Sequence, residues 1–211
     1  MKRLEADREE MIALLRERGI IHDRLLRAMT MVERHQFVPE PFTGRAYEDS
    51  ALPIGKGQTI SQPYTVAFMT QALDVHEGDR VLEVGTGSGY QAAILAAMGA
   101  RVFSIERNLD LLASARKVLD RLGYNIATKG GDGTVGWSEF APYDGIMVTA
   151  GAPDIPQPLL NQLSEGGRLV IPVGDLTVQT LIVCIRHGET YERRAVEGFK
   201  FVPLIGKMGW S

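Results

Sequence analysis

The chain has 211 residues, 45% of them hydrophobic, with a formal net charge of -3 and a pI near 5.8. This length and apolar content suit one globular domain over residues 1–211, and the acidic balance argues against a nucleic-acid partner. No segment has the character of a signal peptide or a membrane span, so we expect a soluble, cytoplasmic protein.

Residues 1–73 are predicted to form a helical prefix followed by a loop. The apolar stripe of a first amphipathic helix consists of Leu4, Met11, Ile12 and Leu15. A second helix is predicted to start at Asp23, and prolines at 39 and 41 end its pattern. Residues 46–63 are then rich in turn formers and show no periodicity. An ordered loop of this length indicates a lid or a wall of a functional site.

The run "GKGQTISQP", residues 55–63, poses the question of what Ser61 does. A helix is predicted from Pro63, because apolar residues follow at helical spacing and proline suits a first turn. Ser61 would then be a helix cap. A nucleophilic serine needs a base nearby, and the run contains neither histidine nor aspartate. Capping and a binding role are compatible, since amide donors at a helix start favour an anion.

Residues 74–211 alternate between predicted strands and helices, which indicates a parallel sheet. Strands are expected at 80–85, 101–106, 125–129, 143–151 and 166–174, and helices at 91–98, 109–122 and 158–163. Right-handed crossovers make a doubly wound, mostly parallel, Rossmann-like α/β sheet the expected fold. Residues 177–199 read as two strands around a Gly188-Glu189 turn, which predicts an antiparallel hairpin at the sheet edge.

The first of these strands ends in "EVGTGSGY", residues 83–90, a turn whose glycines let the backbone approach a ligand. A dinucleotide-binding fingerprint would need a glycine where Tyr90 stands. The carboxylate of Glu83 would also repel a pyrophosphate, whereas it would attract the sulfonium and ammonium groups of S-adenosylmethionine. These residues favour S-adenosylmethionine over NAD as the cofactor.

Two further carboxylates stand at positions that suit cofactor binding. Glu106 closes the second predicted strand about 20 residues after the glycine turn, where an acidic side chain accepts hydrogen bonds from ribose hydroxyls. Asp132 lies in "GGDGT", residues 130–134, after the third strand, and could border the adenine. Alone, that segment would be read as a turn, because Asp-Gly is a common turn pair.

The glycine turn, the "GDG" loop, "GGRLVIPVG" and above all "LPIGKGQTISQP" resemble the protein-L-isoaspartate O-methyltransferases over nearly the whole chain. The glycine turn alone is typical of any class I S-adenosylmethionine-dependent methyltransferase, whereas "GQTISQP" is highly specific. The resemblance implies that Ser61 is the active-site residue and that Thr59 and Ile60 help to hold the substrate. It further implies that the cofactor is contacted by Glu83, Gly85, Thr86, Gly87, Glu106, Asp132 and Gly133.

The activity implied by the resemblance is methyl transfer to the free α-carboxylate of L-isoaspartyl residues in damaged proteins and peptides. S-Adenosylhomocysteine would be the second product, and repair would proceed through a succinimide. A small-molecule methyltransferase and a non-catalytic S-adenosylmethionine-binding module are the alternatives. We expect a monomer. We expect no metal, because the four histidines show no ligand spacing, and the single cysteine, Cys184, reads as a core residue.

Overall fold

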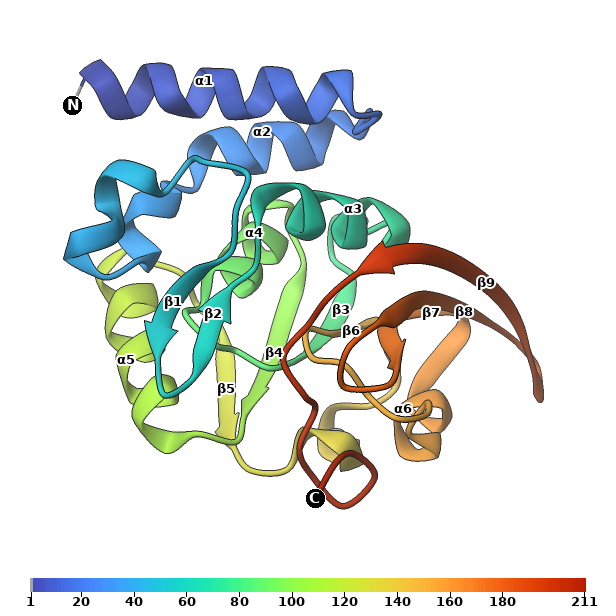
Figure 1. Cartoon of the computed structure of the whole chain (residues 1–211). Coiled ribbons are helices and arrows are strands. Elements are labelled where there is room, and N and C mark those ends of the chain that lie inside the picture. Colours follow the sequence, from blue (N-terminus) through green and yellow to red (C-terminus); the bar gives the residue numbers. More distant parts are fainter. Residues whose placement is uncertain (1) are drawn as a thin grey trace.

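A seven-stranded sheet with the strand order β5-β4-β3-β6-β7-β8-β9 forms the centre of the computed structural model, which describes residues 2–211 (Figure 1). The strands are β3 (Arg80–Val84), β4 (Arg101–Glu106), β5 (Ala127–Gly130), β6 (Tyr143–Val148), β7 (Leu163–Gly174), β8 (Gln179–His187) and β9 (Thr190–Phe199). The pairs among β3 to β7 are parallel, and β8 and β9 continue the sheet as antiparallel strands. The predicted Rossmann-like sheet with an antiparallel hairpin at its edge is therefore confirmed.

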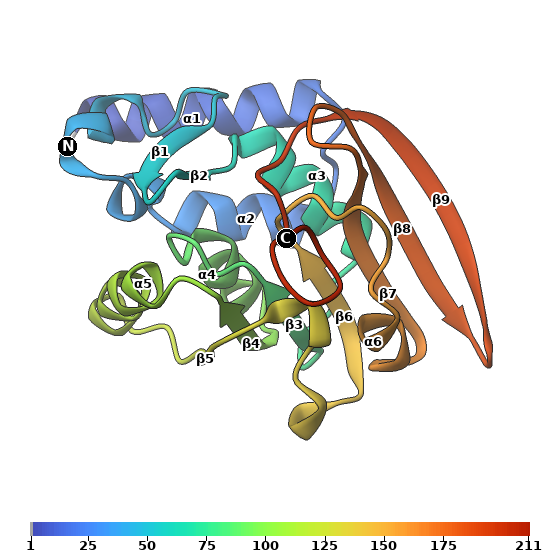
Figure 2. The ribbon, with the colours of Figure 1, turned by 60° about the horizontal axis from the view of Figure 1, so that its bottom comes forward.

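Helices cover both faces of this sheet (Figures 1 and 2). They are α1 (Lys2–Glu17), α2 (Asp23–Met31), α3 (Pro63–Leu73), α4 (Tyr90–Ala97), α5 (Leu109–Arg121) and α6 (Gln157–Asn161). Side chains of α1 to α5 share one apolar core with alternate strand residues such as Val81 and Met147, and α6 packs with Leu82 and Val148 on the other face. This alternation follows from the period of two in a strand. Cys184 lies fully buried in the second core, as predicted.

The segment between the prefix helices and α3 is more regular than its sequence suggests. Two 3-10 helices, η1 (Arg34–Phe37) and η2 (Glu40–Arg45), are followed by an antiparallel hairpin of β1 (Leu52–Gly55) and β2 (Gln58–Ile60). Gly55, Lys56 and Gly57 all have positive φ at its turn, which explains both glycines of "GKGQTISQP".

After β9 the chain returns to the middle of the sheet, where Pro203 pairs with Gly151 beyond the end of β6 (Figures 1 and 2). The indole nitrogen of Trp210 donates to the Gly151 carbonyl at 3.1 Å and holds the tail there. Parallel strands share one carboxyl end, so the glycine turn, the loop after β6 and this tail surround the same space. Among residues 2–211, no helix combines the length and apolar character that crossing a membrane requires.

Candidate active site

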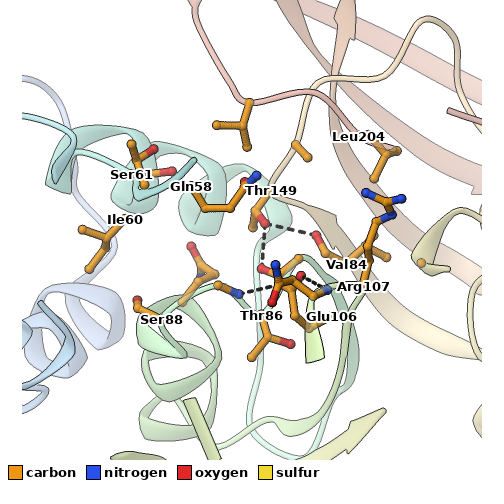
Figure 3. Close-up of a pocket in the computed structure, with 18 of the residues that line it drawn as sticks. Gln58, Ile60, Ser61, Val84, Thr86, Ser88, Glu106, Arg107, Thr149 and Leu204 are labelled. Carbon is orange, nitrogen blue, oxygen red and sulfur yellow. Dashed lines mark hydrogen bonds between the residues drawn. The ribbon is translucent and has the colours of Figure 1, made fainter. Parts of the chain in front are cut away.

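A cavity lies at the carboxyl ends of β3 and β4, between the sheet and the β1-β2 hairpin (Figure 3). Its walls comprise the hairpin residues 56 and 58–61, the glycine turn 84–88 with residues 90 and 91, the end of β4 at 105–108, Gly133, residues 149–150 and the tail 202–205, together with Val66 and Met69. The cavity therefore brings together segments that lie far apart in the sequence, from residue 56 to residue 205. The predicted residues Thr59, Ile60, Ser61, Gly85, Thr86, Gly87, Glu106 and Gly133 all line it.

Close backbone packing explains the glycines of this wall. A Cβ on Gly85, whose φ is +100°, would lie 2.3 Å from Oγ1 of Thr149. That hydroxyl donates to the Gly85 carbonyl at 2.8 Å (dashed in Figure 3) and so joins the glycine turn to the end of β6. A Cβ on Gly133 would lie 2.4 Å from a methyl group of Val84. Larger residues at either position would displace the wall.

Glu106 holds the glycine turn from the neighbouring strand. Its carboxylate accepts from the Gly87 amide at 2.9 Å and from the Asn108 amide at 2.8 Å (Figure 3). The side chain is 9% exposed and lines the cavity. A carboxylate can accept about four hydrogen bonds, so two acceptor positions are left for a ligand.

Glu83 does not line the cavity. It lies in β3 between Leu82 and Val84, so its side chain points to the opposite face, where it is fully buried and hydrogen-bonded to the Ser104 hydroxyl. Burial raises the pKa of Glu83 to about 8, the Ser104 hydrogen bond opposing the shift, so this carboxyl is mainly protonated at neutral pH. The expected direct charge contact between Glu83 and the cofactor is therefore wrong. Glu83 instead holds Ser104 from inside the core, and the Ser104 hydroxyl lies 2.6 Å from the Thr86 hydroxyl in the cavity wall.

Asp132 does not line the cavity either. Its carboxylate accepts from the amide of Lys207 at 2.7 Å and from the amide and hydroxyl of Thr134 at 2.9 and 2.7 Å. Burial raises the pKa of Asp132, but these hydrogen bonds outweigh it and the pKa falls below its ordinary value. This side chain anchors the C-terminal tail and its neighbour Gly133 reaches the cavity, while the contact of Asp132 with the adenine stays a prediction.

Ser61 lies between β2 and α3, and its side chain is partly exposed. The N-cap of α3 is Gln62, which makes no side-chain capping bond, so the expected capping role of Ser61 is wrong. Among the described residues, none forms a hydrogen bond with the Ser61 hydroxyl, whereas the Ser61 carbonyl accepts from Arg34 at 2.7 Å. The hydroxyl is left available to a ligand, and no histidine or carboxylate activates it as a nucleophile.

A second cavity adjoins the first, between the start of α3 and the end of β9. Aromatic rings from α3, from the last residue of β9 and from the segment after it line this cavity, together with two cations: Arg18, Tyr64, Phe68, Phe199, Lys200 and Phe201. Four residues line both cavities: Thr59, Ser61, Thr149 and Val202. The two cavities therefore meet at Ser61.

Comparison with known proteins places this architecture in a family. Residues 6–209 match the family profile of protein-L-isoaspartate(D-aspartate) O-methyltransferase. A protein-L-isoaspartate O-methyltransferase of Salinibacter ruber is 56% identical over 209 residues, covering 94% of this chain and 91% of the relative. One of Syntrophus aciditrophicus is 51% identical and covers 100% of this chain and 99% of the relative. The chain belongs to the protein-L-isoaspartate O-methyltransferase family.

Solved structures agree with this membership. A protein-L-isoaspartate O-methyltransferase superimposes with a TM-score of 0.88 at 29% identity, covering 96% of this chain and 67% of that one. A putative Plasmodium falciparum enzyme of the family, in complex with S-adenosyl-L-homocysteine, gives a TM-score of 0.82 at 26% identity and covers 93% of this chain and 97% of that one. The chain is an S-adenosylmethionine-dependent protein-L-isoaspartate O-methyltransferase, as the sequence motifs indicated.

The residues of the first cavity suit S-adenosylmethionine. The backbone of Gly85 and Gly87 lines the cavity without a side chain, and Glu106 keeps acceptor positions for hydroxyl groups. The cofactor prediction is thus confirmed for this methyltransferase. The argument from a negative charge on Glu83 is wrong, because that carboxyl is buried and mainly protonated.

Several wall residues of this methyltransferase escaped the sequence motifs. Thr149 follows β6 and bonds the glycine turn, and the tail residues 202–205 close the first cavity. Gln58 belongs to "GQTISQP" but was not singled out, although it lines the wall (Figure 3). Thr149 lies near the end of the strand predicted at 143–151, which is where ligands of parallel sheets bind, and this position could have pointed to it.

Proposed function

We propose that the cofactor occupies the first cavity, that the isoaspartyl segment of the protein substrate enters the second, and that methyl transfer takes place where they meet, at Ser61. The main support for this proposal is that the two cavities share lining residues, among them Ser61 and Thr59. Each reactant then has its own walls, and the shared boundary is the place where a methyl group can pass between them.

Distinct parts of the first cavity would hold the cofactor. Glu106 would accept hydrogen bonds from the ribose hydroxyls, and the backbone at Gly85, Thr86 and Gly87 would approach it closely. Gly133 would border the adenine. When bound, S-adenosylmethionine supplies an electrophilic methyl group on a positively charged sulfur.

The methyl acceptor needs no general base. An α-carboxylate has a pKa of about 4, so it is already ionised at neutral pH. Ser61 would donate a hydrogen bond to one carboxylate oxygen and hold the other in line with the methyl group, at roughly 3 Å. Thr59 and the Ile60 backbone would hold the neighbouring part of the peptide, and the aromatic side chains of the second cavity would exclude water from the ions.

The product is a methyl ester, which accounts for repair. Methoxide leaves more readily than oxide, so the following backbone amide attacks the ester carbonyl within the same chain and closes a succinimide. Hydrolysis of that ring at either carbonyl regenerates some normal aspartyl linkage. The enzyme takes no part in the later steps, since the ester leaves the site.

Paired peptides test the proposed substrate class. We expect methyl transfer from labelled S-adenosylmethionine to a peptide with an isoaspartyl linkage and at least about 100-fold less to the same sequence with an aspartyl linkage, because only the former has a free α-carboxylate on a lengthened backbone. The measurement is base-released labelled methanol from each peptide. Equal labelling of both peptides, or labelling of a small carboxylic acid alone, would contradict the substrate assignment.

We also infer that the chain acts as a single domain, as a monomer, in the cytoplasm. The two cavities draw on residues 18 to 205, so the prefix and the sheet contribute to one site, and the single cysteine, Cys184, is buried. Light scattering of the purified protein checks the monomer, whose mass is 23.2 kDa.

A further inference from the structure

Arg34 is a fully buried cation that binds the main chain of the active-site segment. It lies in η1 and is 0% exposed. Its Nε donates to the Ala46 carbonyl and one terminal nitrogen donates to the Ser61 carbonyl, both at 2.7 Å. Neither cavity is lined by Arg34 itself. Its hydrogen bonds therefore connect the N-terminal prefix directly to the peptide unit of Ser61.

The charge of Arg34 has no carboxylate partner among the described side chains. The carboxylate whose field reaches it is Asp49, and Asp49 is already paired with Arg18. The second terminal nitrogen of Arg34 is buried and forms no hydrogen bond within the described part of the chain. Burial lowers the pKa of Arg34, but a guanidinium stays protonated at neutral pH. A buried charge of this kind is costly unless an opposite charge comes close.

The position of Arg34 relates this charge to both reactants. Its guanidinium carbon lies 5.0 Å from the centre of the Tyr90 ring, and Tyr90 lines the first cavity. On its other side the guanidinium bonds to Ser61, which lines both cavities. The positive charge is therefore hydrogen-bonded to the main chain of the residue at which the two cavities meet.

We propose that Arg34 is a positioning residue for the methyl-accepting carboxylate, holding Ser61 by its carbonyl and attracting the ionised acid with a positive charge that forms no ion pair with a described carboxylate. The proposal rests on the proposed function of Ser61. Methylation turns the carboxylate into a neutral ester, so the attraction acts on the reactant and disappears in the product. Because the negative charge is already partly lost in the transition state, the charge of Arg34 acts mainly on substrate binding.

Two peptides separate this role from a purely structural one. The first carries an isoaspartyl linkage with its free carboxylate, and the second has that carboxylate replaced by a carboxamide of the same shape. Affinities of both are measured on the full chain saturated with S-adenosylhomocysteine. The wild type should prefer the acid, and Arg34→Met should lower that preference by about three- to tenfold, with binding of the carboxamide and of S-adenosylhomocysteine within about twofold of the wild type.

Conservative and surface variants complete the test. Arg34→Lys keeps the charge, so it should keep the acid preference within about threefold, while its kcat falls because lysine cannot bridge Ala46 and Ser61 as the guanidinium does. Arg45→Met removes an exposed arginine that pairs with Glu48 and should change neither quantity. An unchanged acid preference in folded Arg34→Met overturns the proposal, and so does an equal loss for both peptides.

Other outcomes are equally decisive. If Arg34→Met does not fold, Arg34→Lys decides: a folded lysine variant that loses the acid preference overturns the assigned role of the charge, and one that keeps it with a lowered kcat supports both parts. A wild type that shows no preference for the acid, or that does not methylate the isoaspartyl peptide, contradicts the proposed function of the site instead.

Discussion

Replacing Ser61 by alanine should lower the turnover number on isoaspartyl peptide by about one to three orders of magnitude, as expected when an aimed donor to a charged reacting group is lost. Affinity for S-adenosylhomocysteine should stay within about twofold, because the Ser61 hydroxyl lies at the boundary with the second cavity. Steady-state kinetics and calorimetry on the same preparation measure both quantities.

Stability distinguishes this role from a helix cap. Loss of a cap costs about 0.5 to 2 kcal/mol, but Ser61 precedes the N-cap of α3, so we expect little change in the free energy of unfolding. Ser114→Ala, which removes an exposed hydroxyl on α5, is the matched control and should leave turnover unchanged. Rapid quench of the wild type followed by intact mass measurement should reveal no covalent adduct. Normal turnover of Ser61→Ala, or a methyl or acyl enzyme in the quench, would remove Ser61 from the proposed role.

Glu106→Ala should weaken binding of S-adenosylhomocysteine by about 1 to 3 kcal/mol, the usual cost of leaving hydrogen-bonding groups unpaired. The structure adds a second cause, because the substitution also removes the acceptor of the Gly87 and Asn108 amides, which hold the cavity wall. The sheet core does not depend on this carboxylate, so the fold should persist. Isothermal calorimetry gives the affinity, and far-ultraviolet circular dichroism checks the fold.

Two variants control the Glu106 measurement. Glu106→Gln retains one oxygen acceptor of the same reach, so its loss of affinity should be smaller than that of alanine. Glu189→Ala removes an exposed carboxylate at the β8-β9 turn, far from the cavity, and should bind as the wild type does. Wild-type affinity in Glu106→Ala would mean that the ribose hydroxyls are bound elsewhere.

Local sequence patterns were sufficient to predict the order of the elements and the parts of the cavity wall that belong to the motifs. β4 has the predicted bounds of 101–106, and the antiparallel hairpin turns where Gly188 predicts it. These features depend on apolar runs and turn residues that lie close together in the sequence. The glycine turn was found for the same reason, because Gly85 and Gly87 belong to one short motif.

Local patterns could not predict side-chain direction or distant contacts. The residues around Glu83 in β3 are apolar on both sides, so the sequence does not reveal which face of the sheet its carboxyl takes. Asp132 binds the amide of Lys207, which is 75 residues away in the sequence, and no local pattern predicts such a contact. Likewise, the tail residues 202–205 reach the cavity only because the chain folds back after β9.

The most direct test of the account is a crystal structure of the ternary complex with S-adenosylhomocysteine and an isoaspartyl peptide. We expect the cofactor product in the first cavity, the peptide in the second, and the free α-carboxylate within hydrogen-bond distance of Ser61 Oγ, at about 2.5 to 3.0 Å. Thr59 should contact the peptide from the shared wall. A carboxylate bound away from Ser61, or a peptide that leaves the second cavity empty, would contradict the proposal that the reactants meet at this residue.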